Sequence, residues 1–311
     1  MTETASTADP NSTASRSRRE IVWQAAALLA ATLLAYLPVL DAGFIWNDDD
    51  LTAILALVKR QGLSAIWFSS EAFNYWPMTW TSYWIEHQVF GTNPATGLPH
   101  PTSYHVINVL LHATASLLLW RVLVQLGVPG AWLAASVFAV HPVNVESVAW
   151  ITQRKNVLAM VFYLVAMWQF LDFEQTSRRS RYLAAVVAFL LGMLSKGAIV
   201  AMPMLLLVLA WWRRGQVART DVLRTLPFWV VSIVMSGVEI WFQQVRAIGD
   251  ETIRQADLAE RVMASGPIAW FYLQKSLVPL DLAFVYPLWQ FDTSKVLQWL
   301  PLAAGLSCWL S

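Results

Sequence analysis

The 311-residue sequence is 57% hydrophobic and 13% charged, with a net charge of +1 and a mean hydropathy of +0.48. Soluble domains usually hold about 25% charged residues, so this composition excludes an ordinary soluble domain and predicts an all-α polytopic membrane protein. The small net charge gives no reason to expect nucleic-acid binding. The single cysteine, Cys308, excludes an internal disulfide and any cysteine-based zinc site.

Residues 1–20 form a polar, Ser- and Thr-rich tail that ends in Arg16, Arg18 and Arg19. We expect this tail to be disordered and cytoplasmic, because positive clusters favour the cytoplasmic side. The apolar run 21–40 is longer than the roughly 7–15-residue core of a signal peptide, and no small-residue cleavage site follows it. It is therefore the first predicted span, and residues 21–311 are predicted to form one transmembrane domain.

Three consecutive aspartates, Asp48, Asp49 and Asp50, follow the first span almost directly. Carboxylates are costly near hydrocarbon, so an acidic cluster at this place is a candidate functional site. Helix capping is the alternative, since Asn47 or Asp48 could cap a helix beginning near Leu51. Capping would occupy one or two of these residues and leave part of the triplet for another role.

A spanning helix needs roughly 20 mostly apolar residues. The further candidates, in chain order, are 105–126, 130–148, 157–173, 182–197, 198–213, 225–244, 266–280 and 296–311. The stretch 182–212 has arginine clusters on both flanks. Because such clusters favour one side of the membrane, the chain must cross it an even number of times here, which predicts two helices with an apex near Lys196.

With the spans alternating, the long segment 41–104 lies outside the cytoplasm and carries the aspartates near its start. Short helices are predicted at 51–58 and 79–90, and the aromatic residues of the second suit a helix lying on the membrane surface. After residue 245, either both 266–280 and 296–311 span or one of them is re-entrant. The chain stops within an apolar run, so we expect it to be a truncated part of a longer protein.

Three cations, Arg154, Lys155 and Lys196, are predicted to lie outside, close to the ends of spans, against the usual charge bias. Long side chains that snorkel to the interface are one explanation. However, two separate hairpin apices present cations on the side that carries the aspartates. That pattern suits a bound phosphate, which Arg and Lys hold by charge-assisted hydrogen bonds.

Polar residues also occur within or beside the predicted spans. His105, Asn108 and His112 are spaced by three and four residues, so they share one helix face. Interhelical hydrogen bonding is the favoured interpretation, and metal ligation is the alternative. Glu146 faces the aspartate side and either pairs with a cation at 154–155 or belongs to the site. Glu239, near the outer end of the seventh span, has the same two alternatives, an ion pair or a place in the site, on weaker evidence.

Seven short motifs follow one another in a specific order. They are FIWNDD at 44–49, WPMTW at 76–80, FGTNP at 90–94, YHVINVLLH at 104–112, HPVNVESVAW at 141–150, RK at 154–155 and SK at 195–196. Together they resemble the membrane part of the tetratricopeptide-repeat-containing glycosyltransferases of the GT-C superfamily, relatives of the protein O-mannosyltransferases. The resemblance covers roughly residues 20–290, and the HPVNVESVAW block with its following RK pair is its most specific part.

The resemblance implies a GT-C-type transmembrane helix bundle that moves a monosaccharide, with mannose as the first candidate, from a polyprenyl-phosphate carrier to a hydroxyl acceptor, chiefly on protein. Its active site would face the periplasm or lumen, and a bacterial inner membrane is preferred over the endoplasmic reticulum. The expected partners are therefore the lipid-linked donor, the acceptor and the bilayer. The sequence requires no cofactor, and a divalent metal at Asp48 and Asp49 is an open alternative, because carboxylates are suitable oxygen ligands.

By the same resemblance, the family's acidic pair maps onto Asp48 and Asp49, and its cationic positions map onto Arg154, Lys155 and Lys196. One aspartate would take the proton of the acceptor hydroxyl as general base, and the cations would stabilise the leaving phosphate. Supporting or acceptor-binding roles are expected of Trp76, His105, His112, His141 and Glu146.

The sequence departs from the family at four places. Trp76 replaces a frequent Arg or His, Asn156 replaces an acid, Gly197 replaces Glu or Pro, and residues 95–102 form an insertion. These changes bear on the acceptor and the sugar more than on the reaction class. The main rival is a transporter or flippase for a lipid-linked anion, which would also explain external cations, although we see no internal repeat and no matched pair of broken helices. A non-catalytic membrane scaffold is a further rival.

Overall fold

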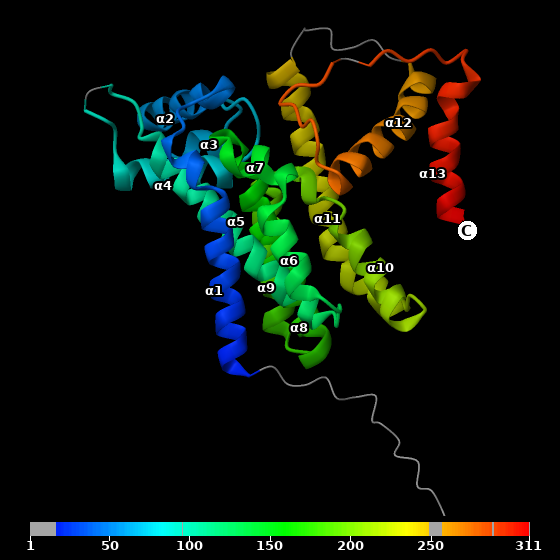
Figure 1. The fold of residues 1–311 in the computed structure, drawn as a ribbon. Helices are drawn as coiled ribbons and strands as arrows, with labels where there is room; N and C mark the ends of the chain where they lie inside the picture. The colour runs from blue at the N-terminus through cyan, green and yellow to red at the C-terminus, as the bar shows by residue number, and fades with distance from the viewer. Residues whose placement is uncertain (1–16, 95, 249–256, 288, 311) are drawn as a thin grey trace, which may run out of the picture.

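The computed structural model describes residues 17–94, 96–248, 257–287 and 289–310, and within these ranges the chain is helical with no β-strand. Figure 1 shows a bundle of long helices with a lobe of short helices at one end. Among the described residues, four helical segments are long and apolar enough to cross a membrane: Pro101–Gln125, Ile151–Thr176, Gly197–Arg214 and Arg219–Val245. The predicted all-α polytopic membrane fold is thereby confirmed.

Helix α1 (Arg18–Ala35) begins earlier than the predicted span 21–40. The Ser17 hydroxyl accepts a hydrogen bond from the Glu20 backbone N–H (3.2 Å), and the Glu20 carboxylate accepts one from the Ser17 N–H (2.9 Å). This reciprocal cap starts the helix within the predicted tail, and the remainder of that tail, residues 1–16, lies outside the described residues. Helix α1 packs against α5 (Pro101–Gln125) and α6 (Ala131–Val140).

The centre of the bundle is formed by α5, α8 (Arg154–Thr176) and α9 (Arg179–Met193). Its buried side chains combine Leu and Met with small and aromatic residues, including Ala115, Ala166, Phe170 and Phe189, and Phe228 of α11 (Arg219–Phe242) joins the same cluster. Small residues let helix backbones approach closely, which is how transmembrane helices commonly pack.

The predicted pair within 182–212 is confirmed: α9 ends at Met193 and α10 (Met202–Arg214) begins after a short non-α connection that contains Lys196. Arg213 pairs with Glu174 at the end of α8 (3.1 Å), and Arg214 pairs with Asp221 at the start of α11 (Arg219–Phe242; 2.6 Å). The arginine clusters therefore share one end of the bundle, where α1 also begins (Figure 1). We call it the arginine end.

The predicted span 130–148 is shorter than expected. Helix α6 stops at Val140, because the residue before Pro142 is disfavoured in the helical conformation. Three short turns follow: η3 (Pro142–Asn144), α7 (Val145–Ala149) and η4 (Ile151–Gln153). They carry the chain across the end opposite the arginines before α8 returns.

The lobe at that opposite end comprises η1 (Leu37–Asp41), η2 (Trp46–Asp48), α2 (Asp49–Gln61), α3 (Ser64–Phe68) and α4 (Pro77–Phe90). Helices were predicted at 51–58 and 79–90, whereas α3 was not. The surface-lying interpretation of the second helix is wrong for its main aromatic residues: Trp80 and Tyr83 are 3% and 0% exposed and pack with Leu51 and Ile66 in the lobe core. We call this end of the bundle the lobe end.

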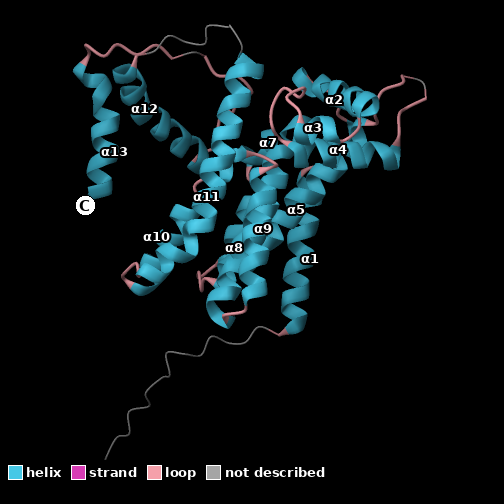
Figure 2. Ribbon diagram, turned by 180° about the vertical axis from the view of Figure 1, so that it is seen from behind, coloured by secondary structure: helices cyan, strands magenta, loops and turns pink. Residues whose placement is uncertain are grey.

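The two C-terminal apolar segments form α12 (Leu258–Leu277) and α13 (Leu300–Leu310), which pack against each other, as Figure 2 shows from behind. Gly266 allows the approach, because a Cβ there would overlap the backbone of Leu302. The Trp270 indole N–H donates to the Pro301 carbonyl (2.9 Å). Both predicted segments are thus helical and adjacent.

Candidate functional site

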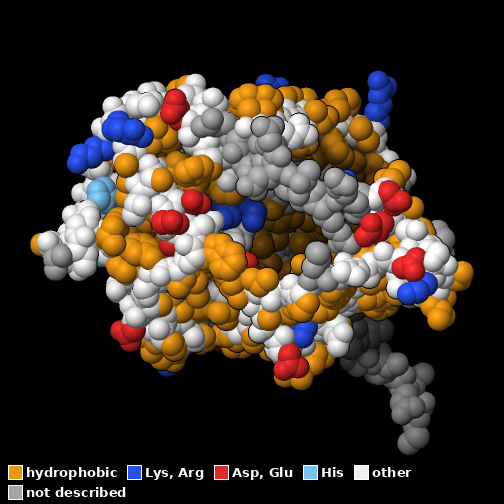
Figure 3. Space-filling model, turned by 90° about the horizontal axis from the view of Figure 1, so that it is seen from above, with side chains coloured by type: hydrophobic (Ala, Val, Ile, Leu, Met, Phe, Trp, Pro, Cys, Tyr) orange, Lys and Arg blue, Asp and Glu red, His pale blue; other side chains and the backbone are white. Residues whose placement is uncertain are grey.

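The polar residues singled out by the sequence gather at the lobe end, where the lobe meets the start of α8, the α9–α10 connection and the end of α11. The start of α4 is tied to the α9–α10 connection by two hydrogen bonds, from the Met78 N–H to the Leu194 carbonyl (3.2 Å) and from the Thr79 hydroxyl to the Ser195 carbonyl (3.0 Å). Seen from this end, Figure 3 shows a hollow with basic side chains at its edge and acidic side chains beside them.

Asp48 is buried (1% exposed), and its carboxylate is bonded to backbone on both oxygens. Oδ1 accepts from the Thr152 N–H and Oδ2 from the Ile45 N–H, each at 2.9 Å. Nearby, the Thr152 hydroxyl donates to Asn47 Oδ1 (3.0 Å). Asp48 thus joins the start of the lobe to η4, 104 residues further along the chain.

Asp49 and Asp50 begin α2 but differ in surroundings. Asp49 is exposed, and its carboxylate makes no hydrogen bond or ion pair within the described residues. Asp50 is half-buried, accepts from the Asn47 amide (3.2 Å) and lies within electrostatic reach of Lys155. Burial and the neighbouring Asp49 raise the pKa of Asp50. The capping alternative raised for Asn47 or Asp48 is not formed at α2, because the N-cap residue Asp48 makes no side-chain capping hydrogen bond to that helix.

Lys155 is 8% exposed at the start of α8. Its ammonium donates to the Thr152 carbonyl (3.1 Å) and lies 4.7 Å from the centroid of the Trp76 ring. An ammonium over an indole face is an attractive cation–π contact. Lys155 is therefore held by η4 and by Trp76, and it interacts electrostatically with Asp50 and Asp48.

Lys196 is half-buried in the connection between α9 and α10, and its ammonium donates to Asn156 Oδ1 (2.5 Å). Burial lowers the pKa of Lys196, and the Glu239 and Glu146 carboxylates oppose that shift. Lys155 and Lys196 are close enough to interact electrostatically. The structure therefore brings together these two lysines, which are separated by 41 positions in sequence.

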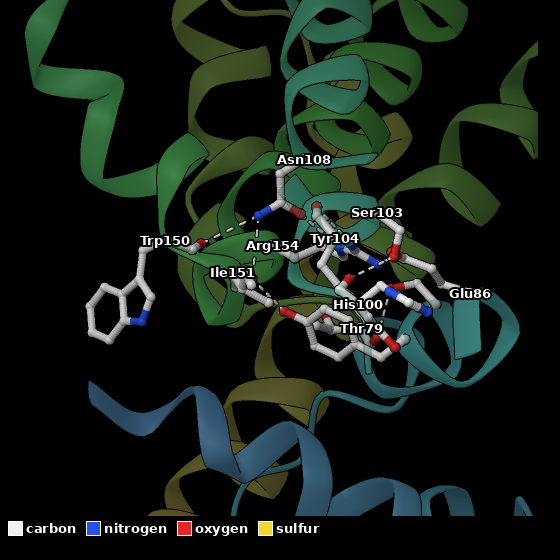
Figure 4. Close-up of polar contacts among 11 residues, drawn as sticks. Thr79, Glu86, His100, Ser103, Tyr104, Asn108, Trp150, Ile151 and Arg154 are labelled. Carbon is white, nitrogen blue, oxygen red and sulfur yellow. Dashed lines mark hydrogen bonds and ion pairs between the residues drawn. The ribbon is translucent and has the colours of Figure 1, made fainter. Parts of the chain in front are cut away.

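Arg154 has no free donor face toward the hollow, although the sequence grouped it with the two lysines. It is fully buried and forms a 2.6 Å ion pair with Glu86 of α4. Its Nε donates to Asn108 Oδ1 (2.8 Å) and its Nη2 to the Tyr104 carbonyl (3.0 Å), as Figure 4 shows. The guanidinium also stacks on the Tyr83 ring (4.5 Å). Its contacts hold the lobe on α5 and α8.

The polar stripe on α5 is buried inside the bundle. Asn108 donates to the carbonyls of Trp150 and Ile151 (3.3 Å each), and His112 Nε2 lies 2.9 Å from the Ala139 carbonyl of α6. The interhelical hydrogen bonding expected of this stripe is therefore present at both residues. His105 is also buried, at 2% exposed.

The remaining predicted residues have separate surroundings. His141 Nδ1 accepts from the Val143 N–H (3.3 Å) and so caps η3. Trp76 donates its indole N–H to Glu239 (3.1 Å). Glu146 is exposed, forms no ion pair among the described residues, and lines a groove of about 400 Å³ between α7 and α12 that also contains Lys275. Of the two alternatives for Glu146, the ion pair with a cation at 154–155 is not formed among the described residues, and the site role stays a prediction.

The described residues contain no group of three or more His, Cys, Asp or Glu side chains arranged to hold a metal ion. The two aspartates considered as metal ligands differ in their contacts, because both oxygens of the Asp48 carboxylate already accept hydrogen bonds from backbone N–H groups, whereas Asp49 is exposed. A divalent ion at Asp48 and Asp49 therefore has little support from the donor geometry.

Three acidic residues gain importance from the structure: Asp50 beside Lys155, Glu239 beside Lys196 and Glu86 against Arg154. Glu239 carried a signal in the sequence as a charge near the end of an apolar span. Asp50 was visible only as a member of the triplet. No local sequence feature marks Glu86, because its partner is 68 residues away.

This architecture is that of a polytopic membrane protein with an apolar helix bundle, an arginine-rich end and an opposite end where acidic residues meet two lysines. Residues 99–241 match the family model described as dolichyl-phosphate-mannose-protein mannosyltransferase. That match covers α5 to most of α11 and includes both lysines, whereas the aspartate triplet lies outside it.

Individual relatives point the same way. The chain is 27% identical to a protein O-mannosyl-transferase of Caenorhabditis elegans over 156 residues, which are 45% of this chain and 22% of the relative. It is 36% identical to one of Mus musculus over 96 residues (30% and 11%) and 30% identical to one of Drosophila melanogaster over 173 residues (50% and 19%). The chain thus spans less than a quarter of these relatives' length. No solved structure matches it. The resemblance to the membrane part of such proteins is confirmed.

Proposed function

We propose that this chain is the membrane part of a glycosyltransferase that moves a monosaccharide from a polyprenyl-phosphate carrier to a hydroxyl group of a protein. Mannose is the first candidate sugar, since the relatives are named protein O-mannosyl-transferases. The observation that carries the proposal is the meeting of Lys155 and Lys196 with the Asp48–Asp50 triplet at one end of an apolar bundle. A donor with a lipid tail and a phosphate head requires an apolar surface for the tail and cations beside it for the phosphate.

The reaction exchanges one bond for another. The acceptor oxygen bonds to the anomeric carbon of the sugar, the bond from that carbon to the phosphate oxygen breaks, and the polyprenyl phosphate leaves with the bonding electrons. A carboxylate takes the acceptor proton. The two ammonium groups offset the negative charge that grows on the departing phosphate, and such fixed charges act most strongly where water is scarce.

The contacts divide these roles among the residues. Asp49 is the proposed general base, because its carboxylate is exposed and uncommitted. Asp48 is a positioning residue, because both of its oxygens are bonded to backbone N–H groups. Lys155 and Lys196 are the proposed phosphate-binding residues. Arg154 is assigned to holding the lobe, since its guanidinium is committed to Glu86, Asn108 and Tyr104.

The proposed orientation places the arginine end in the cytoplasm, by the positive-inside bias. The lobe end then faces the periplasm or lumen, where lipid-linked sugar would be presented. We propose a bacterial inner membrane as the location.

The test is a transfer assay with purified protein in lipid nanodiscs, radiolabelled polyprenyl-phosphate mannose and a Ser/Thr-containing peptide. Wild type should form labelled glycopeptide, and Asp49→Asn should reduce the rate roughly 100-fold or more. Lys155→Met and Lys196→Met should each raise the KM for the donor. Glu71→Gln, an exposed carboxylate of the lobe, is the control. In proteoliposomes, whose two sides can be told apart, movement of the lipid across the bilayer without any glycosidic bond would favour the transporter instead.

A further inference from the structure

Glu239 is a half-buried acid near the lobe end of α11, within a segment apolar enough to span a membrane. An ionisable residue at such a place is costly and is retained for a reason. Its Oε1 accepts the Trp76 indole N–H at 3.1 Å, a contact between residues 163 positions apart. The carboxylate therefore reaches from α11 to the start of α4.

Gly197 makes room for this carboxylate. A Cβ built on Gly197 would overlap Oε2 of Glu239, so no other residue type fits while Glu239 holds its position. The Gly197 backbone does not lie in the left-handed region, in contrast to Gly62 or Gly91. The space that glycine leaves, and not its backbone conformation, thus admits the carboxylate, which lies directly against the chain next to Lys196.

The same carboxylate acts on both lysines. It lies within electrostatic reach of Lys196, while the indole that donates to it has Lys155 over its ring at 4.7 Å. An anion that accepts the indole N–H pushes electron density into the ring, and this polarisation strengthens the attraction of the ring for the ammonium. One carboxylate is thereby linked to two cations that repel each other.

We propose that Glu239 is a positioning residue of the phosphate-binding site: its carboxylate, admitted by Gly197, attracts the Lys196 ammonium electrostatically and orients Lys155 through Trp76 in the arrangement that receives the donor phosphate. This inference rests on the proposed function. The groups facing Lys196 are Glu239 from α11, Glu146 from α7, and Asn156 and Lys155 from α8. Of these, the Glu239 carboxylate is the largest influence that keeps the Lys196 ammonium charged against its burial.

The first experiment separates the charge of Glu239 from its shape. Glu239→Gln keeps an oxygen that accepts the Trp76 N–H but removes the negative charge. We expect donor kcat/KM to fall at alkaline pH in the wild type, and Glu239→Gln to move that decline to lower pH by about one unit, because the opposing charge is gone. In a Lys196→Arg background the same change should cause a smaller shift, since a guanidinium stays charged and only the effect on Lys155 through Trp76 is left.

The second experiment tests the part of Gly197. Gly197→Ala should displace the Glu239 carboxylate and cause the same pH shift of donor kcat/KM as Glu239→Gln. The double variant Gly197→Ala/Glu239→Gln should lose no more kcat/KM than Gly197→Ala alone. The unfolding midpoint lowered by Gly197→Ala should be partly restored by adding Glu239→Ala, which removes the overlapping group. Glu71→Gln is again the matched control. Additive losses, or an alkaline decline that Glu239→Gln leaves in place, would overturn the inference.

A binding measurement keeps this inference apart from the transferase itself. Polyprenyl phosphate, without sugar or acceptor, is titrated into wild type and Glu239→Gln over the same pH range. If wild type binds this lipid but transfers no sugar, the proposed function fails, and the shifted pH limit of lipid binding in Glu239→Gln still supports the role of Glu239. If binding is identical in both proteins, the role of Glu239 fails alone. If wild type binds no lipid, both fail.

Discussion

Asp48, Asp49 and Asp50 are consecutive, but their side chains meet three different surroundings because α2 begins within the triplet. Successive residues of a helix point roughly 100° apart. One carboxylate therefore turns into the protein to bond backbone N–H groups, one turns to solvent, and one lies near Lys155. The three acidic residues in a row identified a candidate site, whereas the helix that begins among them gives each carboxylate different surroundings.

Exchanging each aspartate for asparagine should separate stability from activity. Asp48→Asn places an amide NH₂ where a carboxylate oxygen accepts a backbone N–H, so we expect the free energy of unfolding to fall by about 2 kcal/mol. Asp49→Asn is exposed and should change stability by no more than ~0.5 kcal/mol while reducing sugar transfer. Unfolding in detergent and the transfer assay measure the two effects. Equal destabilisation by both variants would contradict this division.

Asp50 predicts a pH effect on stability. Its raised pKa means that the folded protein holds the proton more tightly than the unfolded chain. That contribution is present below the ordinary aspartate pKa and is lost as the pH rises through the raised folded pKa. Residue 50 does not titrate in Asp50→Asn, so only the wild type loses this contribution as the pH rises. The unfolding midpoint of Asp50→Asn minus that of the wild type should therefore increase with pH through the acid range and then stay constant. Asp41→Asn, an exposed control, should show no such trend, and a constant difference for Asp50→Asn would count against the effect.

Among the helices, η4 and the start of α8 have the largest influence on the site. They supply the Thr152 N–H for Asp48, the Lys155 ammonium and the Arg154 guanidinium within four residues. Hydropathy alone predicted the span 157–173 and left these residues outside it as loop. The short turns η3, α7 and η4 arise from the Pro142 break and from tertiary contacts, which a periodic apolar pattern does not encode.

The Arg154–Glu86 pair should dominate the attachment of α4 to the bundle. Arg154→Met leaves a buried carboxylate unpaired, so we expect a loss of about 3–5 kcal/mol in stability. The double variant Arg154→Met/Glu86→Leu should lose less than Arg154→Met alone, because it leaves no charge behind. Thermal unfolding and limited proteolysis of the lobe provide the measurements.

A surface pair offers the matched comparison for this buried one. Arg213→Met breaks a partly exposed pair with Glu174 and should cost no more than about 1 kcal/mol. If Arg154→Met were as mild as Arg213→Met, the guanidinium would be free for another role, and its assignment to phosphate binding would regain support.

The bundle as a unit has two chemically different ends, and this makes its orientation testable. The sole cysteine, Cys308, can be replaced by serine, and single cysteines introduced by Glu71→Cys at the lobe end and Arg179→Cys at the arginine end. A membrane-impermeant maleimide added to intact cells should label the first variant, and inverted vesicles should give labelling of the second. Labelling of both from the same side would exclude the proposed topology.

The sequence by itself determined the helical membrane class, the paired helices within 182–212, the shared arginine end and the resemblance carried by the ordered motifs. These depend on local apolar runs, charge bias and residue order, all of which act along the chain. Only the tertiary structure decided that Arg154 is committed to Glu86, that Asp49 alone of the triplet is uncommitted, and that Glu239 occupies the space beside Gly197. The reason is physical: whether a charged side chain is already paired depends on partners that lie up to 163 residues away in the sequence. The residue type gives the charge of a side chain but does not say which residue lies beside it.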